Sequence, residues 1–188
     1  MAEAQAGKRV VLFVDAAHFV FGAFLSHVWC FVRVFLRSPS GRQRFNVLGA
    51  LDAVTRQVHL FTNETYITAT SVCSLLSQVA AFYAPRNVPI TLFLDNARYQ
   101  RCQWVMDHAK ALGLELAFLP SYSPNLNLIE RYWRWVKKCC LNAQYHPDFA
   151  SMKNTILNTI ASAHHDYADP LKTLLSWKFQ LFSKIVII

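Results

Sequence analysis

The stretch RVVLFVD (residues 9–15) decides the fold class, because a short β-prone run of apolar residues is followed at once by an acid. The stretch ITLFLD (residues 90–95) repeats this pattern later in the chain. Unbroken apolar runs of this length are typical of strands that are buried on both faces. Both runs therefore predict central strands of a sheet, with Asp15 and Asp95 where each strand stops.

The rest of the chain completes an α/β order around these two strands. The patterns predict a hairpin from residues 45–52 and 56–63, helices at 68–83, 100–112 and 128–141, and a last strand at 114–120. From Pro147 onward we expect one or two amphipathic helices and then a β-prone KIVII segment whose place the pattern leaves open. Three strands ahead of the first helix predict an α/β fold with a mixed five-stranded sheet flanked by helices.

Length and composition predict one folded domain that binds a polyanion. The chain has 188 residues, 54% of them hydrophobic and 16% charged, which excludes a disordered or low-complexity protein. We expect a single domain over residues 1–188, with a core at about 9–145 and a helical tail at about 147–188. The formal net charge of +8 makes nucleic acid a plausible partner.

The cysteines and the N-terminal region predict a cytoplasmic location without a membrane span. Five cysteines without a C-x-x-C pair fit reduced thiols better than a disulfide framework, and no export signal is recognisable. Residues 16–32 carry no Asp, Glu, Lys or Arg, and this length of 17 residues is at the lower limit for a membrane-spanning helix. Polar residues interrupt this stretch, and basic residues follow it, so we expect it not to cross a membrane.

Three carboxylates are the candidate site. Polar groups at the carboxyl ends of adjacent central strands face one crevice, so Asp15 and Asp95 are expected to be neighbours although they lie far apart in the chain. Glu130 opens the helix at 128–141, after a loop rich in proline and asparagine. Each acid also has an ordinary explanation. An Asp can end a strand and begin a turn, and Glu130 can form a capping box with Asn127 or suit the helix dipole.

Three acids brought together would repel each other unless a cation held them. Hard divalent ions such as Mg²⁺ take oxygen ligands, so two or three carboxylates suit them. Two such ions about 4 Å apart can activate a water or a DNA 3′-hydroxyl and stabilise the leaving oxygen of a phosphodiester. The acids therefore predict a metal-dependent phosphodiester chemistry.

The helix at 128–141 is basic on the side that carries Glu130. Arg134 and Lys137 follow Glu130 by one and two turns, opposite an apolar stripe of Ile129, Trp133, Val136 and Cys140. A solvated pair between Glu130 and Arg134 is the ordinary alternative, and it contributes only a few tenths of a kcal/mol. With the basic loop at 38–44, the predicted DNA contacts are Arg42, Arg44, Arg131, Arg134, Lys137 and Lys138.

Three motifs together resemble a known family. VDAAH (14–18), LDNARYQ (94–100) and SPNLNLIE (123–130) are similar to motifs of the catalytic domain of mariner-like DDE transposases, in particular the bacterial insertion-sequence branch. That family favours 34 residues between its second and third acids, as found between Asp95 and Glu130 here. The resemblance covers about residues 9–145. It implies an RNase H-like, retroviral-integrase-like fold with Asp15, Asp95 and Glu130 as the metal-binding catalytic triad.

The resemblance also implies supporting residues and has two departures. Asn96 and Asn127 fall in the motifs as supporting groups. Leu128 stands where the family often has Pro, and Tyr99 or Gln100 stands where many relatives have a His, so a role of that His does not carry over.

The function that the resemblance implies is DNA transposition. The enzyme would be an endonuclease and polynucleotidyl transferase that uses Mg²⁺, with Mn²⁺ as a substitute, and would join transposon ends to target DNA at a TA dinucleotide. Its partners would be both DNAs and further copies of the chain, at the bacterial nucleoid. About eight residues precede the first strand, so we expect the helix-turn-helix for end recognition on a separate chain or an upstream segment.

Two other functions remain open from the sequence. An RNase H-like nuclease with the same fold would cut DNA without joining it. A domesticated or inactive copy would retain DNA binding or an assembly role without catalysis. A 3′-end-joining assay separates the first from a transposase, and a titration with divalent metal separates the second from both enzymes.

Overall fold

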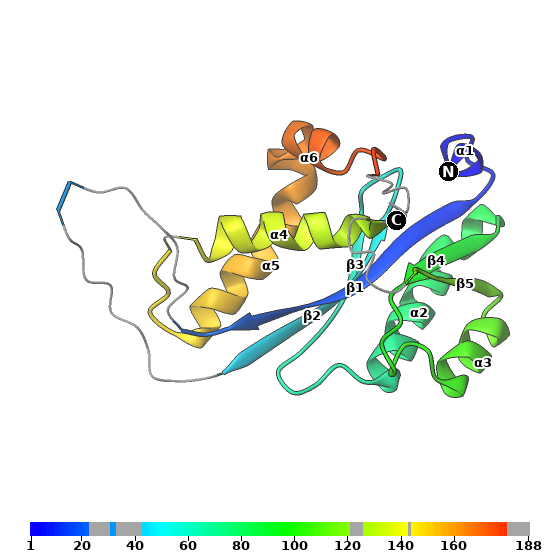
Figure 1. Ribbon diagram of the computed structural model, residues 1–188, viewed down its shortest axis with the longest axis horizontal. Coiled ribbons are helices and arrows are strands. Elements are labelled where there is room, and N and C mark those ends of the chain that lie inside the picture. The colour runs from blue at the N-terminus through cyan, green and yellow to red at the C-terminus, as the bar shows by residue number, and fades with distance from the viewer. Residues whose placement is uncertain (23–30, 33–42, 121–125, 143, 180–188) are drawn as a thin grey trace, which may run out of the picture.

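A mixed five-stranded sheet forms the centre of the computed structural model, which describes residues 1–22, 31–32, 43–120, 126–142 and 144–179. The strand order is β3-β2-β1-β4-β5, in which β1 pairs antiparallel with β2 and parallel with β4 (Figure 1). The strands are β1 (Val10–Val20), β2 (Arg44–Asp52), β3 (Val58–Asn63), β4 (Ile90–Leu94) and β5 (Leu114–Phe118). The predicted sheet and its β2–β3 hairpin are confirmed.

Helices cover both faces of the sheet, as Figure 1 shows. One face packs against α2 (Ala69–Tyr83) and α3 (Gln103–Ala111), and the other against α4 (Leu128–Cys140) and α5 (Phe149–Asp166). Among the described residues there are also three short elements: α1 (Ala2–Gln5), the 3₁₀ helix η1 (Ala84–Arg86) and α6 (Ala168–Leu174). The two layers give two separate apolar clusters, one on each side of the sheet.

Strand β1 contributes to both clusters because successive side chains point to opposite faces. Leu12 and Val14 lie in the cluster with α2, whereas Phe13 and Ala17 lie in the cluster with α4 and α5. Asp15 has the same parity as Phe13 and Ala17. The alternation therefore places the Asp15 side chain on the face that α4 covers.

The prediction that the first strand stops at Asp15 is wrong. Strand β1 continues to Val20, and its second half pairs only with β2, so Asp15 lies inside the strand opposite Gly49. The alternation continues through this half, with Phe19 buried and His18 exposed. A polar residue does not end a strand that still has a pairing partner and a buried face.

The other boundaries agree with the sequence prediction to within a few residues. The largest shift is at α3, which begins at Gln103 instead of residue 100. The residues before it form a turn in which the N–H groups of Gln100 and Arg101 both donate to the Ala97 carbonyl. This turn keeps the chain after β4 in a loop for several residues beyond Asp95.

Close packing of α4 on the sheet depends on Gly49. A Cβ atom at this position would lie 2.6 Å from Cζ2 of Trp133 and 3.0 Å from Cδ1 of Ile129. Trp133 and Ile129 belong to the predicted apolar stripe of α4, all of which is buried. The absent side chain therefore lets α4 approach the strand that pairs with β1 at Asp15.

The remaining predictions about membranes and thiols concern only part of the chain. Within the described ranges, no helix is both long and apolar enough to cross a membrane. Residues 16–20 of the uncharged stretch belong to β1, and residues 23–30 lie outside the described ranges, as does the KIVII segment. Of the cysteines, Cys30 also lies outside them, and the others are free thiols: Cys73, Cys102, Cys139 and Cys140.

We predict that Gly49→Ala destabilises the protein by about 1–3 kcal/mol, because the new methyl group forces the Trp133 indole away from β2. Urea unfolding monitored by tryptophan fluorescence measures this change. Gly22→Ala is the control, since a Cβ there meets nothing within 4 Å. Equal stability of the Gly49→Ala protein and the wild type would show that α4 does not depend on this contact.

Candidate active site

The pairing of β1 with β4 sets the positions of the first two acids. The parallel ladder runs from Val10 opposite Ile90 to Phe13 opposite Phe93. Asp15 and Asp95 each follow the last pair by two residues, so they share one register and one face of the sheet. The rings of Phe13 and Phe93, two residues before the acids, stack with their centroids 5.3 Å apart. Sequence-distant acids thus become neighbours, as the two apolar runs predicted.

The loop after β4 is fixed by side-chain hydrogen bonds. The Ala97 N–H donates to Asp95 Oδ1 at 3.0 Å, which closes a short turn around the carboxylate. The Asn96 Nδ2 group donates to the Leu119 carbonyl at 2.6 Å, just beyond β5. Asn96, predicted as a supporting residue, therefore ties the ends of β4 and β5 together beside Asp95.

The start of α4 brings in Glu130, and Asn127 links this start to β1. Asn127 is 1% exposed, and its Nδ2 group lies 3.5 Å from the Val14 carbonyl, one residue before Asp15. Its side chain makes no capping hydrogen bond to α4, so the capping-box explanation of Glu130 is wrong. Burial directs the Asn127 amide toward the strand instead of the helix. This places the first turn of α4 next to the Asp15 segment.

The electrostatics couple the three carboxylates. Burial is the largest cause of a rise in the pKa of Asp15 to about 7. The charges of Glu130 and Asp95 add to this rise, and the Ala16 N–H and Lys137 oppose it. Burial also raises the pKa of Glu130, which Arg134 lowers and Asp95 raises again. Each acid therefore lies within the field of the others, in a partly buried position where their repulsion is weakly screened.

Tyr99 belongs to the same neighbourhood. Burial, together with the charges of Asp95 and Asp15, raises the pKa of its phenol to about 12. The phenol is therefore neutral at physiological pH and can donate a hydrogen bond. The sequence marked Tyr99 only as a place where relatives often carry a His.

The donor set suits a hard divalent cation, although the triad is not assembled at bonding distance. Among the described residues, no group of three or more His, Cys, Asp or Glu side chains is close enough to hold a metal ion. Two features still fit a cation. All the donors are carboxylates, and the Asp15 charge is desolvated and repelled by two further acids. The metal-binding role of Asp15, Asp95 and Glu130 therefore stays a prediction.

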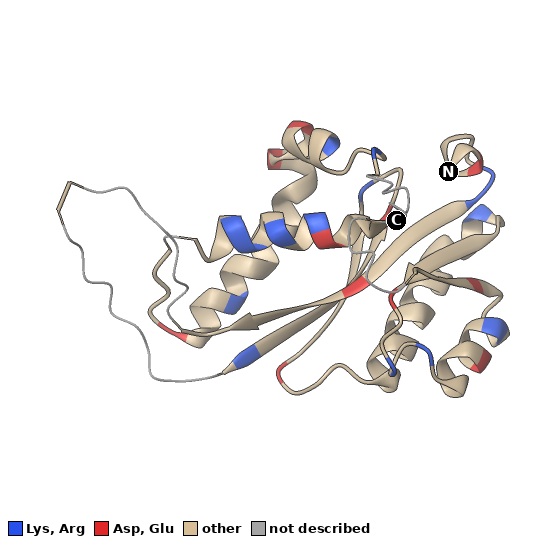
Figure 2. Cartoon of the chain, in the orientation of Figure 1, with Lys and Arg blue, Asp and Glu red and all other residues tan. Residues whose placement is uncertain are grey.

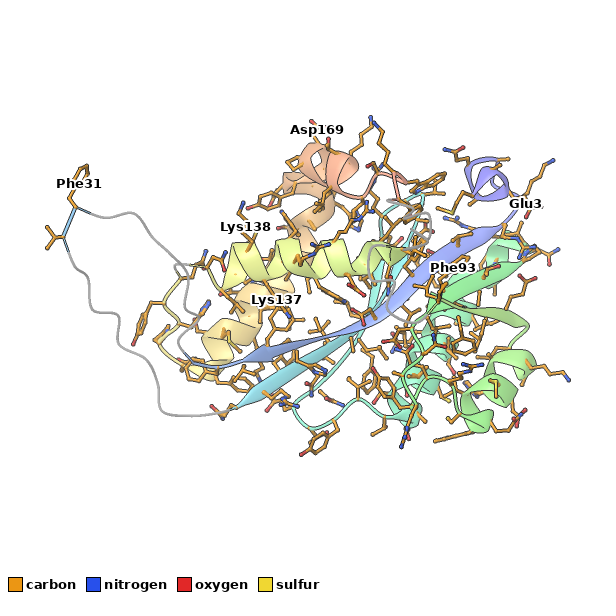
Figure 3. All side chains as sticks on the ribbon, in the orientation of Figure 1. Glu3, Phe31, Phe93, Lys137, Lys138 and Asp169 are labelled. Atoms are coloured by element: carbon orange, nitrogen blue, oxygen red, sulfur yellow. The ribbon has the colours of Figure 1, made fainter. Side chains whose placement is uncertain are left out.

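Basic residues lie along α4, the helix that carries Glu130, as the blue bands in Figure 2 show. Arg134 is exposed and close enough to Glu130 to lower its pKa. Lys137 lies on the side of α4 that faces β1, with Nζ 5.8 Å from the centre of the Phe19 ring (Figure 3). Lys138 is exposed on the other side of the helix. Arg134 and Lys137 thus share the side of Glu130, as predicted.

The remaining predicted DNA contacts differ in their surroundings. Arg44 is exposed at the start of β2, whereas Arg42 lies outside the described residues. Arg131 binds within the chain: its guanidinium donates to the carbonyls of Ser176 at 3.0 Å and Lys178 at 3.2 Å. It also lies 5.5 Å from the centre of the Phe179 ring. Arg131 therefore fastens the C-terminal segment to α4, and we leave it out of the proposed DNA surface.

Sequence reasoning missed the residue that lets α4 approach the site. Gly49 lies directly opposite Asp15 and accommodates the Trp133 ring. The signal was present, since a glycine inside a β-prone run often marks a close approach of another segment. The sequence could not say which segment approaches.

The comparisons with known proteins agree with this architecture. A family model described as DDE superfamily endonuclease matches residues 8–153. No curated protein matches the sequence. Among solved structures, the Mos1 mariner paired-end complex with Mn is similar, with 16% identity, a TM-score of 0.61, and coverage of 92% of this chain and 56% of that one.

Two retroviral structures are also similar. The intasome of simian T-cell lymphotropic virus, solved with the PP2A regulatory subunit B56 gamma, has 15% identity and a TM-score of 0.58. That match covers 82% of this chain and 48% of the other. The catalytic core domain of BIV integrase has 17% identity, a TM-score of 0.54, and coverage of 83% and 84%. The present chain thus spans about half the length of the transposase and intasome chains, and the likeness concerns the fold.

We predict that Asp15 makes the stability of the protein fall as pH rises from about 4 to 7. In this window the unfolded Asp15 is ionised while the folded one retains its proton, because burial raises its pKa from 3.8 to about 7. The folded state then binds more protons, so the free energy of unfolding decreases with pH. Above pH 7 the loss is complete.

Asp15→Asn should remove this loss. The variant should gain stability relative to the wild type between pH 4 and pH 7, and the difference should level off above pH 7. Urea unfolding at a series of pH values in EDTA measures it. Parallel pH profiles for the two proteins would contradict the raised pKa.

Proposed function

The chain belongs to the DDE superfamily of endonucleases, and from this premise we propose that it is the catalytic domain of a DNA transposase. The observation that carries the proposal is the shared register of Asp15 and Asp95 beyond the β1–β4 ladder, with Glu130 in the field of both. A protein that used these acids only as turn and cap residues would not need to couple them. The proposed reactions are DNA strand cleavage and strand transfer.

Each acid would be a ligand of Mg²⁺, or of Mn²⁺ in its place. Bound there, the ion supplies a Lewis acid for the attacking and leaving oxygens of a phosphodiester. The protein positions Asp95 through its turn with Ala97, and Glu130 through the contact of Asn127 with the strand. Asp15 is held inside β1, paired with Gly49 of β2 and two residues beyond the ladder with β4. The acids thus come from a rigid frame, as ligand positioning requires.

The chemistry has two steps on DNA. In the first, water attacks a phosphorus atom at the transposon end, the bond to the 3′-oxygen breaks, and that oxygen leaves as a 3′-hydroxyl. In the second, this hydroxyl attacks a phosphodiester of target DNA, and the target's own 3′-oxygen leaves. The exposed cations Arg44 and Arg134, together with Lys137, would contact phosphates and hold both DNAs across the acids, and Lys138 would contact phosphates from the other side of α4.

Several finer assignments complete the proposal. The motif resemblance supports the bacterial insertion-sequence branch, a TA target and action at the nucleoid. Transposition joins two ends, so we propose that at least two copies of the chain act together. The +8 charge supports binding of phosphates without sequence selection, so we propose that a helix-turn-helix on another chain or segment recognises the ends.

We predict that Asp15→Asn, Asp95→Asn and Glu130→Gln each abolish Mg²⁺-dependent cleavage and joining of DNA while leaving the fold intact. Each change removes a charge from the proposed ligand set and keeps the side-chain size. A gel assay with a labelled transposon end reports both steps, because cleavage shortens the strand and 3′-end joining lengthens it. Circular dichroism checks the fold.

The control is Asp107→Asn, an exposed acid on α3 that should leave both steps unchanged. Wild-type cleavage by the Asp15→Asn protein would refute the triad. Cleavage without joining by the wild type would identify a nuclease. Absence of both steps at every metal concentration, with DNA binding retained, would identify an inactive DNA-binding protein.

We predict that Arg134→Ala and Lys137→Ala weaken DNA binding and lower the salt dependence. Each lost phosphate contact should make the negative slope of log K against log salt shallower by about one unit. Fluorescence anisotropy with one duplex at several salt concentrations measures the slope. Lys172→Ala, on α6, is the matched control. Unchanged slopes would mean that Arg134 only pairs with Glu130 and that Lys137 only covers Phe19.

A further inference from the structure

The loop between β4 and α3 carries two cations that the function proposed above does not use. Arg98 and Arg101 are exposed and follow Asp95 by three and six residues. The loop begins at the Asp95 turn and ends where α3 starts, so both arginines lie at the carboxyl end of β4. This is the end of the strand at which the acids gather.

The Arg101 guanidinium is held by neutral groups. Its Nη1 donates to Asn96 Oδ1 at 3.2 Å, and its Cζ lies 5.5 Å from the centre of the Phe118 ring. Asn96 is itself fixed by its bond to the Leu119 carbonyl. A guanidinium over an aromatic ring with one nitrogen engaged still has donors free for another oxygen acceptor. The Arg101 charge is thus positioned in advance.

Among the residues that the structure describes, no acid forms an ion pair with Arg98 or Arg101. The ion pairs found among the described residues join Arg9 to Glu3 and Glu115, and Lys153 to Glu64. None of them involves Arg98 or Arg101. The exposed Arg101 guanidinium, with its plane fixed and no carboxylate partner in the described part of the chain, matches the geometry of a phosphate, which accepts from arginine in a bidentate manner.

We propose that Arg101, with Arg98, binds backbone phosphates of DNA on the β4–β5 side of the acids. The inference rests on the proposed function, because it takes DNA as the substrate. Arg134 and Lys137 lie on α4, which packs on one face of the sheet, whereas Tyr99 and Cys102 of this loop pack on the other face. The bound strand would then be held by cations on both sides of the acids. Arg101 would be a DNA-positioning residue, and Asn96 would orient its guanidinium.

A purely structural role for Arg101 makes a different prediction. If the side chain only covers Phe118, its methylene stem matters and its charge does not. Arg101→Met retains an apolar stem and removes the charge, whereas Arg101→Lys retains the charge and removes the planar fork. The two variants therefore separate packing from phosphate binding.

The experiment measures DNA binding by the full chain at several salt concentrations in EDTA, so its readout does not depend on cleavage. We expect Arg101→Met to make the negative slope of log K against log salt shallower, by about one unit per lost phosphate contact. Arg101→Lys should retain the slope and bind more weakly. Arg98→Met tests the loop independently of the Phe118 contact, and thermal melting checks the fold of each variant.

Arg86→Met is the matched control. Arg86 is also exposed and also lies over an aromatic ring, 5.0 Å from the centre of Tyr83, but it precedes β4 at the other end of the strand. Its removal should leave the slope unchanged. Slopes equal to the wild type for both Arg101→Met and Arg98→Met would overturn the inference and leave the proposed function intact. Salt-independent or absent binding by the wild type would overturn both.

Discussion

The short parallel pairing of β1 with β4 is the constraint on which the site depends. Four residue pairs, ending with Phe13 opposite Phe93, set the register that makes Asp15 and Asp95 neighbours. A slip of one residue would turn one of the two acids to the opposite face of the sheet. The apolar residues that bury the ladder on both faces oppose such a slip, because it would expose them. Core packing and placement of the acids are therefore one requirement.

The second constraint is the approach of α4, which carries the third acid. Asp15 gains its raised pKa mainly from burial, and α4 provides part of the cover on that face. The helix can approach because Gly49 leaves room for Trp133, and Asn127 joins its first turn to the strand. Burial and repulsion together make the ionised acids unfavourable without a counter-charge. The fixed positions of the acids therefore favour binding of a positive charge, either a proton or a metal cation.

Local patterns in the sequence were enough for the sheet, the helices and the pairing of distant acids. They were not enough for the extent of β1, because Asp15 resembles a strand end until the antiparallel partner of its second half is known. Arg131 shows a similar limit. Its position in a basic helix indicated DNA, yet carbonyls from the C-terminal segment bind it. Such contacts arise from tertiary packing and leave no periodic signal in the sequence.

Opposite charges occupy different positions around the site. The acids occupy partly buried positions around the end of the β1–β4 ladder, whereas Arg98, Arg101 and Arg134 are exposed on the elements around them. A polyanion attracted by the cations would be repelled by the ionised acids themselves. A proton or a cation at the acids removes this repulsion, so the proposed metal binding and the proposed DNA binding should favour each other. This linkage follows from the placement of the charges and requires no movement of the fold.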